Sequence, residues 1–258
     1  MVMRKRGDFF GLGTVPAVIV VTIAGMLIVF FGYKIADMSK DLSDVERCRI
    51  SVAAKAGTTK WGMESPLVKN IKCFTRFIEV KEKGVYKRTR EQKERLLYFF
   101  DSLGEEAKKE KVEKAIADEM HDCWYQMGEG KVMPWGTLHQ EALGRCVICS
   151  QISFEKGIGE MDVGSFLANE NIPGKGITYA KYLGYDESLP AKKIGTDETL
   201  NVVFIAVTSG AVETVGIRWR YDSLIEVNVP LETEGERSDI KMGIFRNEDV
   251  VGECSQLY

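Results

Sequence analysis

The chain has little histidine, little proline and almost no net charge. Its 258 residues include 2 histidines and 6 prolines, and 35 Lys and Arg nearly balance 38 Asp and Glu, for a formal net charge of -3. A chain without a global basic field has no electrostatic basis for binding nucleic acid. With only His121 and His139, zinc sites and catalytic triads built on histidine have few candidate residues.

The sequence also lacks the local motifs of common enzyme classes. It contains no G-x-S-x-G nucleophile elbow, no H-E-x-x-H zinc motif and no phosphate-binding loop. The run Gly128-Glu129-Gly130-Lys131 is rich in glycine, but its spacing and its place after a helical pattern predict only a helix end. We therefore predict no catalytic residue and no cofactor, and we favour a binding protein over an enzyme. A carboxylate- or metal-dependent hydrolase without a local motif is left open.

One long apolar run interrupts this ordinary composition. Residues 14–33 carry no charged side chain, and a helix of that length rises about 30 Å, the thickness of the hydrocarbon core of a bilayer. Pro16 suits the first helical turn, and Phe10 and Tyr33 are placed where aromatic rings meet the two lipid interfaces. The run predicts an uncleaved single-pass anchor in the cell membrane, with the lipid bilayer as a partner. A cleaved secretory signal is the alternative, but such signals are shorter.

Charges beside this run predict its orientation. Arg4, Lys5 and Arg6 form a tight cluster before it, whereas the basic residues after it are spread among acids. Positive charge next to a membrane helix favours the cytoplasmic side. We therefore expect a short cytoplasmic tail over residues 1–13 and an extracytoplasmic location for the bulk of the chain.

All the cysteines follow the apolar run, at Cys48, Cys73, Cys123, Cys146, Cys149 and Cys254. An even number on one side of a membrane is typical of disulfides formed in an oxidising compartment. The sequence does not choose among their pairings. We predict that these six residues form structural disulfides and that the chain holds no metal.

The Cys146-Val-Ile-Cys149 motif has three interpretations: two separate disulfides, a redox dithiol, or half of a zinc site. Its β-branched surroundings predict a strand, on which residues three apart point to opposite faces. This favours a separate partner for each cysteine. A zinc site would need His121, Cys123 or His139 as further ligands, and their spacing is poor. We interpret both histidines as ordinary polar residues.

The remaining pattern predicts an α+β fold in which helices come first and a mostly antiparallel C-terminal sheet follows. Residues 34–56 are expected to continue the anchor as a helical stalk, or to pack on their own domain. Residues 57–258 form the extracytoplasmic domain, with a subdivision near residue 195 left open. Helices are predicted at 89–103, 105–127, 165–169 and 178–183, and a strand pair turns near Lys83-Gly84. Further strands are predicted at 200–209, 213–222, 223–231, 240–246 and 249–254.

Two resemblances accompany these patterns. The run Arg4-Lys5-Arg6-Gly7 before an apolar helix resembles prepilin and archaellin leaders, which a peptidase cuts after the glycine before the helices pack into a filament. The anchor, Cys123-Trp124, the glycine-rich run at 128–130, the CVIC motif and the segment IPGKGITYAKYL together resemble uncharacterised archaeal single-pass membrane proteins with a CxxC-containing surface domain. The first resemblance implies a filament subunit. The second implies a surface-facing domain and no particular reaction.

These observations predict a membrane-anchored, disulfide-stapled extracytoplasmic protein that binds other proteins or assembles on the surface. Two alternatives stay open. One is an extracytoplasmic thiol–disulfide oxidoreductase that uses Cys146 and Cys149, and the other is a pilin-like filament subunit cleaved after Gly7.

Overall fold

The computed structural model describes residues 22–23, 25–26, 43–60, 71–88, 93–132, 144–185, 193–208, 225–233, 236–250 and 255–256. Residues 1–43 and 44–258 form two compact units. In the first unit, residues 22–23 and 25–26 are helical. The rest of the predicted anchor lies outside the described residues, as do Arg4, Lys5, Arg6, Phe10, Pro16 and Tyr33. Within the described part of the chain, no helix is both long enough and apolar enough to cross a membrane.

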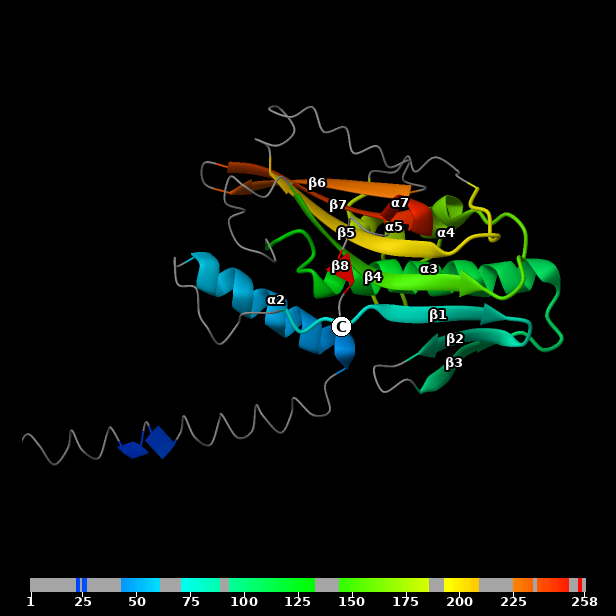
Figure 1. The fold of residues 1–258 in the computed structure, drawn as a ribbon, viewed down its shortest axis with the longest axis horizontal. Coiled ribbons are helices and arrows are strands. Elements are labelled where there is room, and N and C mark those ends of the chain that lie inside the picture. The colour runs from blue at the N-terminus through cyan, green and yellow to red at the C-terminus, as the bar shows by residue number, and fades with distance from the viewer. Residues whose placement is uncertain are drawn as a thin grey trace, which may run out of the picture. The chain divides into compact units, whose positions relative to one another are not determined.

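The second unit is an α+β domain built on one mixed sheet of eight strands (Figure 1). The strands lie in the order β3-β2-β1-β4-β5-β7-β6, and β8 pairs with β4. The elements in chain order are α2 (Asp44–Lys60), β1 (Arg76–Lys81), β2 (Gly84–Arg88), β3 (Glu94–Phe99), α3 (Glu105–Gln126), β4 (Gly144–Phe154), α4 (Val163–Asn169), α5 (Tyr179–Leu183), β5 (Leu200–Thr208), β6 (Ile225–Thr233), β7 (Glu236–Arg246), α7 (Asn247–Val250) and β8 (Ser255–Gln256).

Both parallel pairings of the sheet involve β4. It runs parallel to β1 and to β8, whereas the other neighbouring strands are antiparallel. The predicted antiparallel arrangement is therefore confirmed for β5, β7 and β6. The predicted order of elements is wrong, because β1, β2 and β3 precede α3 in the chain and join the same sheet as the C-terminal strands.

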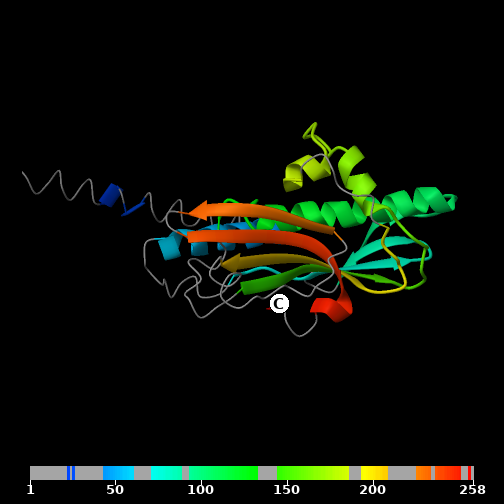
Figure 2. The same ribbon diagram turned by 90° about the horizontal axis from the view of Figure 1, so that it is seen from above.

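Helix α3 is the centre of the layer that covers one face of the sheet. It packs on β4 and β5 and also contacts α2, α4 and α5. Figure 2 shows α3 running along the sheet, with α4 and α5 beyond it. The apolar positions that recur at steps of three and four along α3 explain why the segment is helical. All of them are buried: Val112, Ile116, Met120, Cys123 and Met127.

The hydrophobic core has one part on each face of the sheet, and β4 contributes to both. Val147 and Cys149 belong to the large cluster beneath the helices, whereas Cys146 and Ile148 belong to a smaller cluster with residues of β5 and β7. A β-bulge between Ile148 and Ser150 shifts the alternation of the side chains. Because of this bulge, Ile152 again belongs to the large cluster.

Helix α2 contains the second half of the predicted stalk. It spans Asp44–Lys60 and so continues past Gly57, where the sequence pattern predicts its end. Its Cys48 and Val52 are fully buried, and the helix contacts α3. The described part of this helix therefore packs on its own domain.

Most of the other predicted elements are confirmed. The strand pair around Lys83-Gly84 is β1 and β2, the segment 105–127 is α3, the CVIC motif lies in β4, and α4 and α5 occupy the two short helical segments. The strands predicted at 200–209, 223–231 and 240–246 correspond to β5, β6 and β7. The strand predicted at 213–222 lies outside the described residues.

Two local predictions are wrong. The predicted helix at 89–103 contains the edge strand β3, where Tyr98 pairs with Val85 of β2 and its hydroxyl bonds to Asp118 of α3. The apolar run from Leu96 to Phe99 has no helical face, so these pairings decide its structure. The strand predicted at 249–254 is wrong at its start, because helix α7 spans Asn247–Val250.

Candidate functional site

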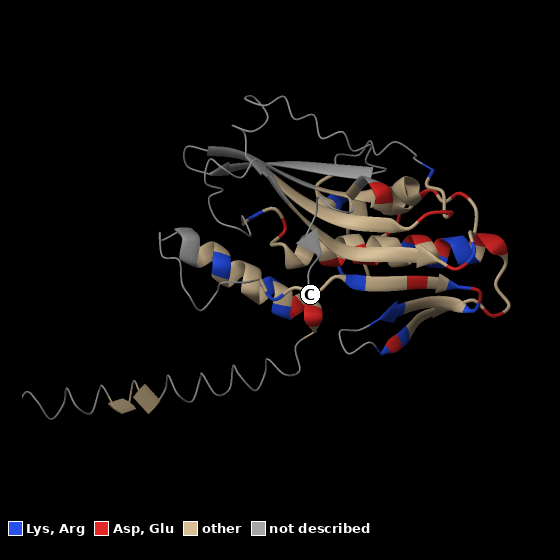
Figure 3. Cartoon of the chain, viewed as in Figure 1, with Lys and Arg blue, Asp and Glu red and all other residues tan. Residues whose placement is uncertain are grey.

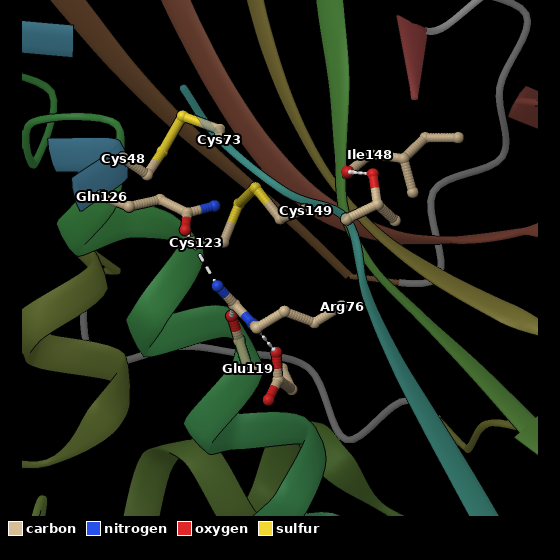
Figure 4. The surroundings of a disulfide bond; sticks show 9 residues. Cys48, Cys73, Arg76, Glu119, Cys123, Gln126, Ile148 and Cys149 are labelled. Atoms are coloured by element: carbon tan, nitrogen blue, oxygen red, sulfur yellow. Dashed lines mark hydrogen bonds and ion pairs between the residues drawn. A yellow bond between two sulfur atoms is a disulfide. The ribbon is translucent and has the colours of Figure 1, made fainter. Parts of the chain in front are cut away.

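Two disulfides fasten helices to the sheet region. Cys48 of α2 bonds Cys73, which precedes β1, and Cys123 of α3 bonds Cys149 of β4 (Figure 4). All four side chains are buried. Cys146 is also disulfide-bonded, so no cysteine of the described part of the chain is free. The prediction of structural disulfides is confirmed for these five residues.

The two cysteines of the CVIC motif have separate partners. Cys149 bonds Cys123, so it is not bonded to Cys146. Both are buried, and they lie in core clusters on opposite faces of the sheet. A redox dithiol needs two sulfurs that can bond each other and reach a substrate. The geometry therefore opposes the oxidoreductase alternative. Cys254, the sixth cysteine, lies outside the described residues.

The same disulfide engages the sulfur atoms that a zinc site would need as ligands. Cys123 and Cys149 bond each other, and the ring of His121 stacks on Tyr182. Among the residues that the structure describes, no group of three or more His, Cys, Asp or Glu could hold a metal ion. His139 lies outside that part of the chain.

Beside the Cys123–Cys149 bond, a buried ion network joins α3 to β1 (Figure 4). The same network extends to β2. Arg76 of β1 donates from Nε to the carboxylate of Glu119 and from Nη1 to Oε1 of Gln126, at 2.8 Å. Lys87 of β2 donates to the other oxygen of Glu119, also at 2.8 Å. Burial lowers the pKa of Arg76, but the attraction of Glu119 and Asp122 raises it above its ordinary value. Arg76 therefore keeps its charge, and its contacts with Glu119 and Gln126 fix α3 on the sheet.

A row of cations and aromatic rings crosses from α2 over α3 to α5. The guanidinium of Arg49 lies 3.8 Å from the ring centroid of Tyr125. The ring of His121 stacks on Tyr182 with centroids 4.7 Å apart, and it lies nearly parallel to Tyr125 at 6.3 Å. Lys175, in the loop before α5, places its ammonium 3.9 Å from the centroid of Tyr182. We call these five residues the cation–aromatic stack.

Glu129 connects two members of the stack, Arg49 and Tyr182, through its carboxylate. Its carboxylate accepts from the Tyr182 hydroxyl at 2.7 Å and from Arg49 at 3.3 Å, and it pairs with Lys131 at 3.0 Å. Glu129 lies in the turn that follows α3, and its backbone φ of 57° is in the left-handed region. Burial alone would raise its pKa, but the donors Tyr182, Lys131 and Arg49 lower the pKa to about 2. As a carboxylate, Glu129 therefore connects the turn after α3 to α2 and to α5.

The hydrogen bonds of His121 define its protonation. Nδ1 lies 3.3 Å from a carboxylate oxygen of Asp122, and Nε2 lies 3.0 Å from the ammonium of Lys175. A carboxylate only accepts and an ammonium only donates, so Nδ1 carries the proton and Nε2 accepts. Burial raises the pKa of Asp122, but the His121 hydrogen bond and the charges of Arg76 and Lys87 lower it below its ordinary value.

A second polar cluster holds β3 and α5 against α3. Asp118 accepts from the hydroxyls of Tyr98, at 2.8 Å, and Tyr179, and it pairs with Lys114 at 3.2 Å. Burial and the Asp118 carboxylate raise the pKa of both tyrosines. These hydroxyls remain protonated donors, so the cluster has a structural role.

Charges of both signs are interleaved along α3 (Figure 3). The run from Glu105 to Lys114 carries ion pairs of Glu105 with Lys108 and of Glu106 with Lys109. Neither sign dominates this face.

The ionisable groups of the stack and of the ion network bond one another. Tyr125, Tyr182, His121 and Arg49 are partly exposed and are held in fixed positions. Such preorganised aromatic and arginine side chains are typical of binding surfaces.

The sequence analysis missed this stack and placed His121 among ordinary polar residues. The hydrogen bonds that join its elements connect residues 53 to 80 positions apart, so no local pattern contains them. Two local signals do exist: His121 and Tyr125 are four apart on one helix face, and Lys175 stands between two glycines. No family model, no curated protein and no solved structure matches the chain.

Proposed function

We propose that the chain is a membrane-anchored, disulfide-stapled extracytoplasmic protein that binds another protein, or a further copy of itself, through the cation–aromatic stack. The observation that carries the binding role is the stack itself. Tyrosine and arginine dominate the energetics of protein interfaces, and here Glu129 and the neighbouring rings order them before a partner arrives.

The charges at the stack support a partner that presents carboxylates. Arg49 and Lys131 pair with Glu129, and Lys175 adds a third cation to the stack, against the two carboxylates of Glu129 and Asp122. Lys175 contacts the ring of Tyr182 and the imidazole of His121, and its side chain is exposed. An acidic surface would therefore meet a complementary field, which increases the rate and the specificity of association.

The cysteines support the location. Five of the six are disulfide-bonded and buried, and such bonds persist in oxidising compartments. The membrane anchor rests on the apolar run at residues 14–33.

The location is tested by peptide mapping of the chain isolated from its native membrane without reduction. We expect the pairs Cys48–Cys73 and Cys123–Cys149, with Cys146 linked to Cys254, the one cysteine that is left. The β4–β8 register supports the last pair, because it places Ser255 opposite Val147. Six free thiols would contradict both the staples and the compartment.

The binding role is tested by photo-cross-linking in intact cells. A benzophenone amino acid replaces Tyr125 of the stack in one variant, and Tyr86 of β2 serves as the matched control in another. We expect a covalent adduct with a protein from position 125 and none from position 86. Adducts with a second copy of the chain would indicate self-assembly. Equal adducts at both positions, or none at position 125, would refute the proposed surface.

A further inference from the structure

The loop between α4 and α5 carries Lys175 on a narrow hairpin. Asn171 and Thr178 form a bridge at its base, and the amide of Ile172 donates to the carbonyl of Ile177 at 2.9 Å. At the tip, Gly174 and Gly176 have left-handed φ values of 77° and 64°. A Cβ at either glycine would meet no atom within 4 Å, so the tip is not packed against the domain there. The side chain of Lys175 is what reaches back to α3 and α5.

That side chain makes two contacts of different chemistry. Its ammonium lies over the ring of Tyr182 and donates to Nε2 of His121 at 3.0 Å. The second contact requires a lone pair on Nε2, because an imidazolium has donors at both nitrogens and cannot accept. A proton from solvent at Nε2 would turn this hydrogen bond into a contact between two cations.

We propose that His121 and Lys175 form an acid-released latch: when His121 binds a second proton, Lys175 leaves the stack and the tip of the 171–178 hairpin loosens. The latch regulates the proposed binding surface, and in that respect it rests on the proposed function. Release moves the ammonium of Lys175 away from the stack and leaves the imidazolium of His121 over Tyr182.

The positions of the two residues decide which of them moves. His121 lies within a helix of 22 residues, between two rings and beside Asp122, whose carboxylate stabilises an imidazolium. Lys175 is exposed and stands between two glycines. Displacing Lys175 breaks fewer contacts, so repulsion is relieved on the side of the loop.

The other charged groups around His121 keep their charge at mildly acidic pH. The pKa of Asp122 on the same helix is lowered, and that of Glu129 in the following turn is lowered to about 2. The pKa of the Tyr182 hydroxyl on α5 is raised by burial and by Glu129, so this group stays protonated. Among the side-chain types of this cluster, an imidazole is the one that ordinarily takes up a proton in this pH range.

Amide hydrogen exchange of the full-length chain tests the latch without a partner. Exchange of residues 171–178 is compared at about pH 8 and about pH 5, the range over which an ordinary imidazole titrates, after correction for intrinsic rates. We expect opening of this hairpin to increase by about tenfold at the lower pH, given the repulsion of two near cations at the surface. Helix α3 should show no such step.

Three variants separate the latch from other effects of pH. His121→Gln keeps an acceptor for Lys175 and cannot take up a proton, so its exchange should be the same at both pH values. Lys175→Met removes the repelled cation and should also abolish the step. His139→Gln, the matched control at the only other histidine, should keep it. A step that persists in His121→Gln, or no step in the wild type, would overturn the proposal.

The two proposals fail in different ways. If the latch is wrong and the binding surface is right, cross-linking from position 125 at about pH 8 still yields its adduct while exchange of the hairpin shows no step. If the surface is wrong and the latch is right, the exchange step is present and the adduct is absent.

Discussion

The buried ion pair between Arg76 and Glu119 makes the sharpest test of how α3 is held on the sheet. Their side chains are only 4% and 3% exposed, and Lys87 bonds the same carboxylate. The substitution Glu119→Gln keeps the shape and removes the charge. Arg76 then stays buried without its counterion, which costs about 3 to 5 kcal/mol when a buried pair is broken on one side.

The neighbouring strand residue Glu79 provides the matched control. It pairs with Lys81 at 3.0 Å and with Arg88, and its side chain is 25% exposed. Glu79→Gln removes an ion pair of the surface type, for which a loss of about 0 to 1 kcal/mol is usual. The two substitutions are chemically the same, so their difference isolates the effect of burial.

The free energy of unfolding is measured by denaturant titration of the purified full-length chain under non-reducing conditions, followed by circular dichroism. The double variant Arg76→Met/Glu119→Leu should recover about 2 kcal/mol or more relative to the sum of the two single changes, because it leaves neither charge buried alone. Equal losses for Glu119→Gln and Glu79→Gln would show that the Arg76–Glu119 contact does not hold α3 in place.

Three further predictions concern the staples, Glu129 and the N-terminus. Cys123→Ala/Cys149→Ala opens a loop with a sequence separation of 26 and should lower the free energy of unfolding by about 3.5 kcal/mol from chain entropy, as measured by the same titration; a loss below about 1 kcal/mol would contradict a stapling role. The pKa of Glu129 falls from 4.5 to about 2 on folding, so its contribution is complete above pH 4.5 and is lost as the pH falls toward 2. Glu129→Gln should flatten the stability profile in that window, and an unchanged profile would refute the assignment. Mass spectrometry of the mature chain should find an intact N-terminus; a start at Asp8 would support the pilin-like alternative instead.

Local periodicity predicted the parts of the fold that one element decides by itself. The stripe of α3 and the β-branched run of β4 each carry their own signal, and both are confirmed. Alternation along β4 also predicted correctly that Cys146 and Cys149 have separate partners. The bulge beside Ser150 was not predicted, because it depends on the pairing of β4 with β5.

The segment that became β3 shows where this approach fails. Its run Leu96-Leu97-Tyr98-Phe99 is apolar without either period, so local propensity cannot choose a helix or a strand. Pairing with β2 and the hydrogen bond from Tyr98 to Asp118 make the segment a strand, and both partners lie outside the segment itself. The cation–aromatic stack escaped prediction for the same reason, since Arg49 and Tyr125 are 76 residues apart.

The disulfide connectivity has a consequence for biogenesis. During synthesis Cys48 and Cys73 emerge before the other cysteines, and these two consecutive cysteines are native partners. Cys123 meets Cys146 before its own partner Cys149 emerges three residues later. Oxidation in order of arrival would therefore join the wrong pair at this point. Correct assembly requires α3 to dock on the helix-facing side of β4 before the bond closes, or an isomerase to exchange it afterwards.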